Sequence, residues 1–272
     1  MKRLINALSK LFIVIMAFIT VFPFVYMILA SFMSYQEATS IPPTMWPATF
    51  RFSNFTEAMT HAPFGRYFLN TVFVSFITTI GILITSVLAA FAFVKLEFKH
   101  KNLVLGLMIT LLMVPYEAIV FTNYRTIARL GLLNTYSALI VPSLASVFYI
   151  FYLKEYLTSI PISYYKAAKI DGCGDLEFIW KVLLPLSRPA LVTVGLLSFI
   201  SGWNSFLWPI LVTNEKSMRL LNNGLSAFAT ETGTSVHLQM AAATITIVPI
   251  LILYFFFRKE IIRGVSKSGI KG

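Results

Sequence analysis

Charged residues are scarce in this 272-residue chain, at 12% of the total, whereas hydrophobic residues make up 57%. An ordinary soluble domain carries about 25% charged residues. The mean hydropathy is +0.78. So few charges cannot cover the water-facing surface of a soluble protein of this length, which excludes a soluble enzyme, and the high apolar content excludes a disordered chain. The composition indicates a membrane protein.

Cysteine and histidine are also rare. The single cysteine, Cys173, excludes a disulfide framework and a multi-cysteine metal site. The sequence lacks the glycine-rich loop G-x-x-x-x-G-K-[ST] that cradles nucleotide phosphates. The net charge of +11 comes from short basic clusters between apolar runs, which is typical of a membrane protein facing anionic lipids. We therefore expect no metal, no cofactor and no nucleic acid on this chain, and no enzymatic activity of its own.

Long runs with few or no charges predict the membrane helices, each of which needs about 20 apolar residues. We expect an all-α membrane protein with one transmembrane domain over residues 1–272. The first run is too long for a cleaved signal peptide and predicts an uncleaved anchor. The six predicted spans cover about 11–32, 67–94, 102–123, 133–153, 189–213 and 237–257.

The orientation follows from the basic residues in the loops. With the N-terminus inside, 16 of the 22 Lys and Arg residues fall on the inner side, as the positive-inside rule requires. Both termini are therefore predicted to be cytoplasmic, in a bacterial cytoplasmic membrane. The outer loops are 33–66, with a short helix expected around Asn54–Thr60, and 214–236.

The inner loop 154–188, between the fourth and fifth spans, is long and patterned. Pro161 fits a helix start, and Asp171-Gly172 fits its end with a left-handed glycine. Asp175 is placed to cap a second helix, which Pro185 and Pro189 are expected to stop. The loop is thus predicted to form a helix–turn–helix hairpin in the cytoplasm.

Apolar side chains in this loop suggest a docking surface, because a plain connector would be polar. They are Tyr164, Tyr165, Phe178, Ile179 and Trp180. The alternative is a solvated loop that only connects two spans.

In this loop Lys166-Ala167-Ala168 is followed by three residues, Gly172, nine residues and Val182-Leu183-Leu184-Pro185. This spacing resembles the EAA motif of binding-protein-dependent ABC importers, which is Glu-Ala-Ala, three residues, Gly, nine residues, Ile, any residue, Leu-Pro. Lys166 stands in place of Glu and Val182 in place of Ile. The stretch Gly202–Pro209 and the tail from Arg263 to Gly272 are similar to the same family. The likeness is greatest to the second permease of a heterodimer of the maltose and glycerol-phosphate type.

The resemblance implies the type I ABC importer permease fold, in which the hairpin forms coupling helices on a cytoplasmic ATPase dimer. The residues implied in ATPase coupling are Lys166, Ala167, Ala168, Asp171, Gly172, Val182, Leu184 and Pro185. It also implies a second homologous permease, an extracellular solute-binding protein at the outer loops, and ATP with Mg²⁺ in the ATPase subunits. The solute is expected to be a small molecule, most simply a sugar.

A few polar residues near the spans are candidates for the substrate pathway: Glu117, Trp203, Asn204 and Ser205. An ionisable group such as Glu117 usually faces a bundle interior or a water-filled cavity, although it could instead lie at the outer boundary and pair with Arg125 or Arg129. Asn204 could pack between helices, and Trp208 fits an interfacial aromatic belt.

Two other interpretations remain open on sequence grounds. The same architecture would serve an importer of glycerol phosphate or a polyol. An ion-coupled secondary transporter is the alternative from another class, and it would require discontinuous helices, inverted repeats and more carboxylates within the spans.

Overall fold

The computed structural model describes residues 2–230 and 233–268. The described chain divides into two compact units, Met1–Arg66 with Leu221–Ile252, and Tyr67–Leu220 with Leu253–Gly272. Residues 231 and 232 of the predicted second outer loop, and 269–272 of the tail that resembles the family, lie outside the described residues.

The first unit begins with the long apolar helix α1 (Lys2–Ala30) and ends in the first part of α15 (Val236–Ser268). The short helix predicted in the loop after α1 is confirmed, since α3 covers Ser53–His61. The remaining elements of this unit are α2 (Tyr35–Ala38), α14 (Leu221–Gly224), the 3₁₀ turn η4 (Leu225–Phe228), and the antiparallel pair β1 (Ala229–Thr230) and β2 (Gly233–Thr234).

The loop after α1 is folded by its own polar and aromatic contacts. The Asn54 amide donates to the backbone oxygens of Ser31 and Met33, at 2.9 and 2.8 Å. Ser34 and Glu37 form a capping box at α2, in which each side chain accepts from the other residue's backbone N–H. Glu37 also accepts from the backbone N–H of Ala48 at 2.9 Å. These bonds tie the segment between α2 and α3 back onto α2.

Glu37 makes this loop sensitive to acid. Backbone N–H groups of Ser34 and Ala48 donate to its carboxylate and lower its pKa from 4.5 to about 2. Because the folded-state pKa is depressed, the carboxylate stabilises the loop above about pH 4.5, and this stabilisation is lost as the pH falls towards about 2.

We expect Glu37→Gln to loosen this loop at neutral pH, because the charge-assisted bonds to Ser34 and Ala48 are weakened. Limited proteolysis between residues 39 and 50 should be faster than in the wild type at pH 6, and this difference should fade as the pH falls through the window from 4.5 to about 2. Glu57→Gln, on α3, is the control and should cleave like the wild type. A difference that persists unchanged at pH 2 would contradict the assignment.

The second unit is built on the long helix α4 (Phe64–Lys95), which begins at the end of the first unit. It continues through α5 (Lys101–Leu111), α6 (Tyr116–Arg129), α7 (Tyr136–Ile140), the 3₁₀ turn η1 (Val141–Ser143) and α8 (Val147–Thr158). After the predicted hairpin come α12 (Arg188–Trp203), α13 (Leu207–Val212) and the 3₁₀ turn η3 (Lys216–Met218). The hairpin holds α9 (Ile162–Ile170), α10 (Asp175–Phe178), the π turn η2 (Ile179–Leu183) and α11 (Leu184–Leu186).

Three helices of the described chain are each long and apolar enough to cross a membrane: Asn6–Ala30, Phe64–Lys95 and Val236–Lys259. Three further segments pass the same length and composition test only as bent pairs. The number of spans is therefore three by continuous helices and up to six if each bent pair is one span.

The continuous helices expected over 102–123, 133–153 and 189–213 are each interrupted. α5 and α6 meet at 99°, because Pro115 stands at the break, where it cannot donate to the helix. The segment Tyr136–Ser143 meets α8 at 43°. α12 ends at Trp203, and α13 begins only at Leu207. Propensity and hydropathy did not locate these breaks.

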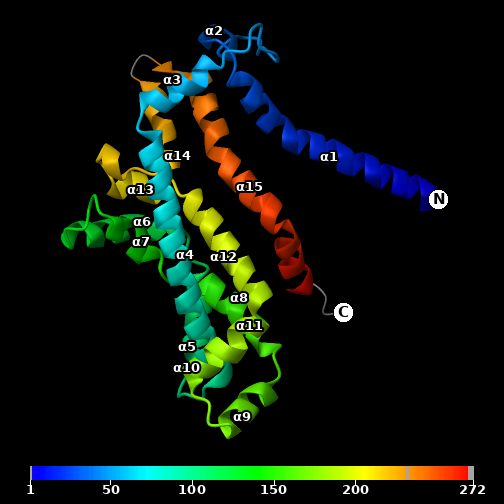
Figure 1. Ribbon diagram of the computed structural model, residues 1–272, viewed down its shortest axis with the longest axis vertical. Helices are drawn as coiled ribbons and strands as arrows, with labels where there is room; N and C mark the ends of the chain where they lie inside the picture. Colours follow the sequence, from blue (N-terminus) through cyan, green and yellow to red (C-terminus); the bar gives the residue numbers. More distant parts are fainter. Residues whose placement is uncertain (1, 231–232, 269–272) are drawn as a thin grey trace. The chain divides into compact units, whose positions relative to one another are not determined.

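α4 and α12 run antiparallel and in close contact (Figure 1). Gly202 faces Ser75, and Gly195 faces Leu83. Between them, the Ser198 hydroxyl donates to Thr79 Oγ1 at 3.3 Å. Small residues at this seam let the two backbones approach, which is the usual basis of helix packing in membranes.

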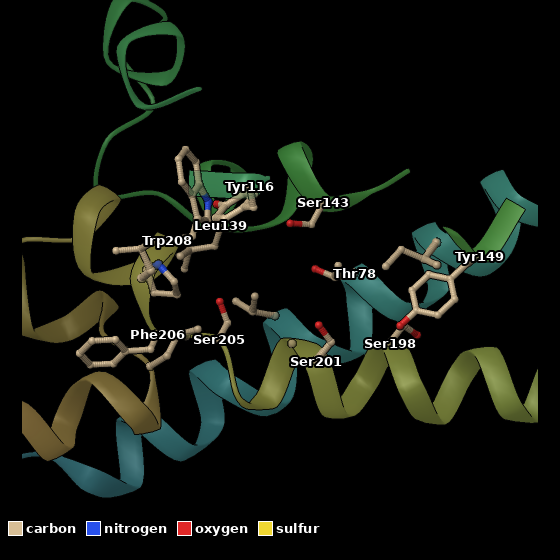
Figure 2. Close-up of a pocket in the computed structure, with 16 residues that line it drawn as sticks. Thr78, Tyr116, Leu139, Ser143, Tyr149, Ser198, Ser201, Ser205, Phe206 and Trp208 are labelled. Atoms are coloured by element: carbon tan, nitrogen blue, oxygen red, sulfur yellow. The ribbon is translucent and has the colours of Figure 1, made fainter. Parts of the chain in front are cut away.

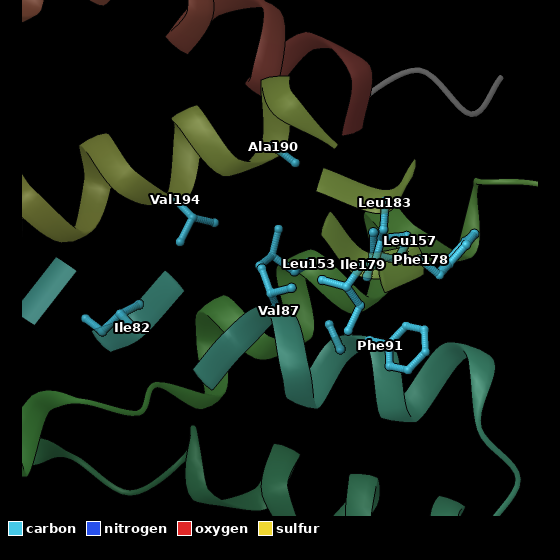
Figure 3. Packing of buried hydrophobic residues seen from close by; sticks show 11 residues of the cluster. Ile82, Val87, Phe91, Leu153, Leu157, Phe178, Ile179, Leu183, Ala190 and Val194 are labelled. Carbon is cyan, nitrogen blue, oxygen red and sulfur yellow. The ribbon is translucent and has the colours of Figure 1, made fainter. Parts of the chain in front are cut away.

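A buried cluster joins these helices to the hairpin (Figure 3). It holds side chains from α4, α8, α12 and the α10–η2 segment, among which Phe178 is fully buried. The members are Ile82, Val87, Ala90, Phe91, Leu153, Leu157, Phe178, Ile179, Leu183, Ala190 and Val194. The second half of the hairpin is thus part of the helical core.

One local prediction for the hairpin is wrong, and another is confirmed. Asp175 does not cap α10: Gly174 holds the N-cap position, and the Asp175 carboxylate turns instead to Lys169 and Tyr165. The helical stretch that starts at Asp175 ends at Leu186, between Pro185 and Pro189, as predicted. Pro185 itself follows the π turn η2 and stands in the first turn of α11. A proline needs no backbone partner there.

Candidate functional site

The first hairpin helix, α9, ends in a Schellman motif. The backbone N–H of Cys173 donates to Ala168 O at 2.8 Å, and that of Gly172 donates to Lys169 O at 3.1 Å. Gly172 has φ of +77°, which confirms the left-handed glycine predicted at this position. The motif satisfies the last carbonyls of α9 and reverses the chain towards α10.

A polar network fastens α9 to α10. Lys169 Nζ and the Tyr165 hydroxyl both reach Asp175 Oδ1, each at 2.7 Å. These two donors hold the pKa of Asp175 below its ordinary value. The Tyr165 ring lies edge-on against the buried Phe178 ring, with centroids 5.1 Å apart. The turn at Gly172 is therefore held by contacts on both sides.

The exposed apolar face of the hairpin is not the one expected from the sequence. Phe178 and Ile179 are buried in the core cluster, and Tyr165 packs against it. Tyr164 and Trp180 are exposed, as a docking surface requires, with Trp180 at 71%. Ile162, Ile170 and Leu176 are exposed as well. Within the second unit, α9 projects at the end away from α13 (Figure 1).

The residues at the EAA-like positions divide between the exposed face and the core. Lys166, Ala167, Asp171, Gly172 and Pro185 are exposed. Ala168, Val182 and Leu184 are partly buried and pack against the core cluster. The arrangement links an exposed helix and turn to a segment that is part of the helical core.

A cavity of about 380 Å³ lies in the second unit, beside the break between α12 and α13 (Figure 2). Trp208 is buried at its edge and donates from Nε1 to Ala138 O at 2.9 Å. The interpretation of Trp208 as part of an interfacial belt is therefore wrong. The hydroxyl-bearing residues that line the cavity come from α4, α6, η1, α8, α12 and the break: Thr78, Tyr116, Ser143, Tyr149, Ser198, Ser201 and Ser205.

The four residues proposed for the substrate pathway have different places. Ser205 lines the cavity, and Tyr116, next to Glu117, also lines it. Glu117 is exposed in the first turn of α6. Trp203 is buried, with its ring edge-on to Phe68 at 5.7 Å, and Asn204 is exposed just after α12 rather than packed between helices of this chain.

Sequence reasoning missed most of the cavity's hydroxyl groups. Ser198, Ser201 and Ser205 recur at helical spacing along the fifth apolar run, a signal that was available in the sequence. Thr78 and Ser143 carried no such signal, because they meet the serines only through the packing of α4 and η1 in the second unit.

Comparison with known proteins identifies the family. The family model described as binding-protein-dependent transport system inner membrane component matches residues 79–267. This chain belongs to that family. It is accordingly a multi-pass protein of the bacterial inner membrane, and its homologues are permease components of transport systems rather than enzymes.

Curated relatives cover nearly the whole chain. The arabinooligosaccharides transport system permease protein AraQ of Halalkalibacterium halodurans is 33% identical, over 94% of this chain and 93% of its own length. The sn-glycerol-3-phosphate transport system permease protein UgpE of Yersinia pestis is 30% identical, over 98% of both. The diacetylchitobiose uptake system permease protein NgcG of Streptomyces coelicolor is 30% identical, over 98% of this chain and 89% of its own length.

A solved structure shares the fold. It is a crystal structure of a bacterial ABC transporter involved in the import of the acidic polysaccharide alginate, and one of its chains aligns with a TM-score of 0.83. The identity is 24%, over 94% of this chain and 96% of that chain. The all-helical ABC importer permease fold is thereby confirmed. The family match also decides against the secondary transporter, even though helices are broken here as that class requires.

Proposed function

We propose that this chain is one of two homologous permease subunits of an ATP-driven importer for a carbohydrate. It would work with a cytoplasmic ATPase dimer that binds ATP and Mg²⁺, and with an extracellular solute-binding protein. The family match and three relatives named as permeases for arabinooligosaccharides, glycerol phosphate and diacetylchitobiose support this assignment. An importer of glycerol phosphate or a polyol would use the same mechanism.

In this proposal the chain crosses the membrane six times, with both termini in the cytoplasm. Three continuous helices and the bent pairs over 101–129 and 136–158 supply five spans, and α12 begins the sixth. Asp175–Leu186, the other half of the third bent pair, belongs to the hairpin. The distribution of Lys and Arg supports this orientation. The hairpin 154–188 then lies on the cytoplasmic side, between the fourth and fifth spans.

The observation that carries the coupling role is the construction of the hairpin. Its exposed part, α9 and the Gly172 turn, presents apolar side chains such as Ile170, which is 86% exposed. Its other part, Phe178 to Leu183, is packed in the core formed by α4, α8 and α12. A well-packed core transmits displacement rather than absorbing it. Closure of two ATPase subunits around α9 would therefore move the helices that bound the cavity.

Affinity purification and uptake test this proposal together. From native membranes extracted in mild detergent, the chain should bring down an ATPase subunit and a second permease. Proteoliposomes of the purified assembly should take up arabinotriose or diacetylchitobiose only with ATP inside and the solute-binding protein outside. Recovery of the chain without an ATPase subunit, or uptake driven by an ion gradient without ATP, would refute the proposal.

A further inference from the structure

The cavity in the second unit has a polar lining without charge. Thr78, Ser198, Ser201 and Ser205 place hydroxyl groups along two facing helices and the break after α12 (Figure 2). Among the described lining residues there is no Lys, Arg, Asp or Glu. The site therefore offers hydrogen-bond donors and acceptors but no counter-ion.

Thr78 is the residue that gives the strongest indication of a ligand in this cavity. It is 94% buried, since its exposed fraction is 6%, and Oγ1 lacks a hydrogen-bond partner among the residues that the structure describes. A buried hydroxyl group without a partner is destabilising, and such groups in native proteins call for an explanation. A group that enters the cavity and bonds to Oγ1 would remove this deficit.

The remaining walls are apolar and aromatic. The rings of Tyr116, Tyr149 and Trp208 line the same space. A sugar unit carries hydroxyl groups at its edges and C–H groups on its faces, so it suits a lining of hydroxyls and rings. A phosphate group does not, because burying an ion without a counter-charge is strongly unfavourable.

We propose that this chain itself holds a binding subsite for one unit of a neutral carbohydrate, in the cavity between α4, α12 and η1. Thr78 Oγ1 and the hydroxyls of Ser201 and Ser205 hydrogen-bond the solute, and the rings exclude water from it. The volume of about 380 Å³ lies at the lower end of the range of small-molecule sites, about 300–1,000 Å³. This proposal rests on the proposed function and narrows its solute to an uncharged one.

Thr78→Val tests the buried hydroxyl, because valine keeps the shape of threonine and removes only the polar group. The KM for uptake of arabinotriose or diacetylchitobiose should rise about three- to tenfold, which is the effect of losing one neutral hydrogen bond. The matched control is Ser86→Ala, which removes another buried hydroxyl of α4 without a partner, outside the cavity lining. Its KM should stay at the wild-type value.

A cysteine reporter tests occupancy without relying on turnover. Cys173 is the single cysteine of the chain, so Cys173→Ala with Ser143→Cys leaves one thiol in the cavity lining, at a residue to which no bond to the solute is assigned. In the assembled transporter without ATP, alkylation of that thiol by a small maleimide is followed by mass spectrometry of this chain. Arabinotriose or diacetylchitobiose should slow the alkylation, and glycerol 3-phosphate should not.

The outcomes separate the two proposals. ATP-dependent sugar uptake with an unchanged KM in Thr78→Val, and alkylation that no sugar slows, would show that the cavity holds only water. That result would overturn the subsite while the permease assignment stands. If glycerol 3-phosphate, rather than a sugar, is taken up and slows alkylation of the cavity thiol, the proposal of a neutral subsite is also overturned. Absence of any ATP-dependent uptake in the wild type would overturn the proposed function.

Discussion

Replacing Gly172 by valine is expected to abolish solute uptake while leaving the protein inserted in the membrane. Gly172 has φ of +77° in the turn between α9 and α10. A β-branched residue in this region is disfavoured by about 1–2 kcal/mol. The valine variant must therefore open the Schellman motif that Gly172 and Cys173 close with α9. The exposed face that docks on the ATPase would then change direction.

The backbone, rather than crowding within the chain, is the reason for this expectation. Apart from Gly172 and its two neighbours in the chain, no described residue has an atom within 4 Å of a Cβ built on Gly172. The same is true of Gly174, two residues further along, whose φ of −70° suits any side chain. Gly174→Val is therefore the matched control, with the same side chain added to the same exposed turn.

Three measurements separate the possible results: the amount of each variant in the membrane, recovery of the ATPase subunit on purification, and ATP-dependent uptake in proteoliposomes. Gly172→Val should be present in the membrane at the wild-type amount but should lose both ATPase recovery and uptake. Gly174→Val should match the wild type in membrane amount, ATPase recovery and uptake. Normal ATPase recovery and uptake in Gly172→Val would refute the role of the hairpin in coupling.

Gly172 also illustrates what the sequence could reveal. The bounds of α9 could be predicted from Pro161 before it and Asp171-Gly172 after it, because the residues next to a helix end largely determine where the helix starts and stops. The same holds for α3, predicted around residues 54–60 and observed at Ser53–His61. Local signals therefore defined both helices nearly to the residue.

The faces of the hairpin could not be predicted in the same way. Phe178 and Trp180 both appeared available for docking, yet Phe178 is buried against Phe91 and Tyr165, while Trp180 is exposed. Which side of α10 is buried depends on where α4 and α8 lie. The tertiary packing decides this, and local sequence signals do not reveal it. The network of Asp175 with Lys169 has the same origin, since it displaced a capping bond that was equally compatible with the sequence.

The cavity could not be predicted from the sequence, for a related reason. The three serines Ser198, Ser201 and Ser205 share a helical spacing, but no spacing in the sequence relates them to Thr78 on α4 or Ser143 on η1. Hydropathy also treated 102–123 as one helix, because it averages over Pro115, where the backbone turns by 99° between α5 and α6. The break places Tyr116 at the cavity and leaves Glu117 exposed beside it.

Gly202→Ala is expected to destabilise the second unit, although alanine normally favours a helix over glycine. A Cβ at Gly202 would lie 3.1–3.2 Å from the Oγ, Cα and Cβ atoms of Ser75 on α4. The Ser75 Cα belongs to the backbone, so the contact is relieved only if α4 and α12 move apart. Such a shift strains the packed seam, including the Ser198–Thr79 hydrogen bond one turn away, and overpacking of this kind costs about 1–3 kcal/mol.

Gly195→Ala provides the contrast on the same helix. A Cβ there would meet only the Leu83 side chain, at 3.7 Å, an ordinary van der Waals contact. Without crowding, the helix propensity of alanine should stabilise this variant by up to about 1 kcal/mol. Unfolding of each variant in detergent, followed by tryptophan fluorescence, should therefore move the midpoint in opposite directions for the two glycines. Equal midpoints would mean that α4 and α12 do not meet at Ser75 and Gly202, and would remove the structural basis for a cavity enclosed between these two helices.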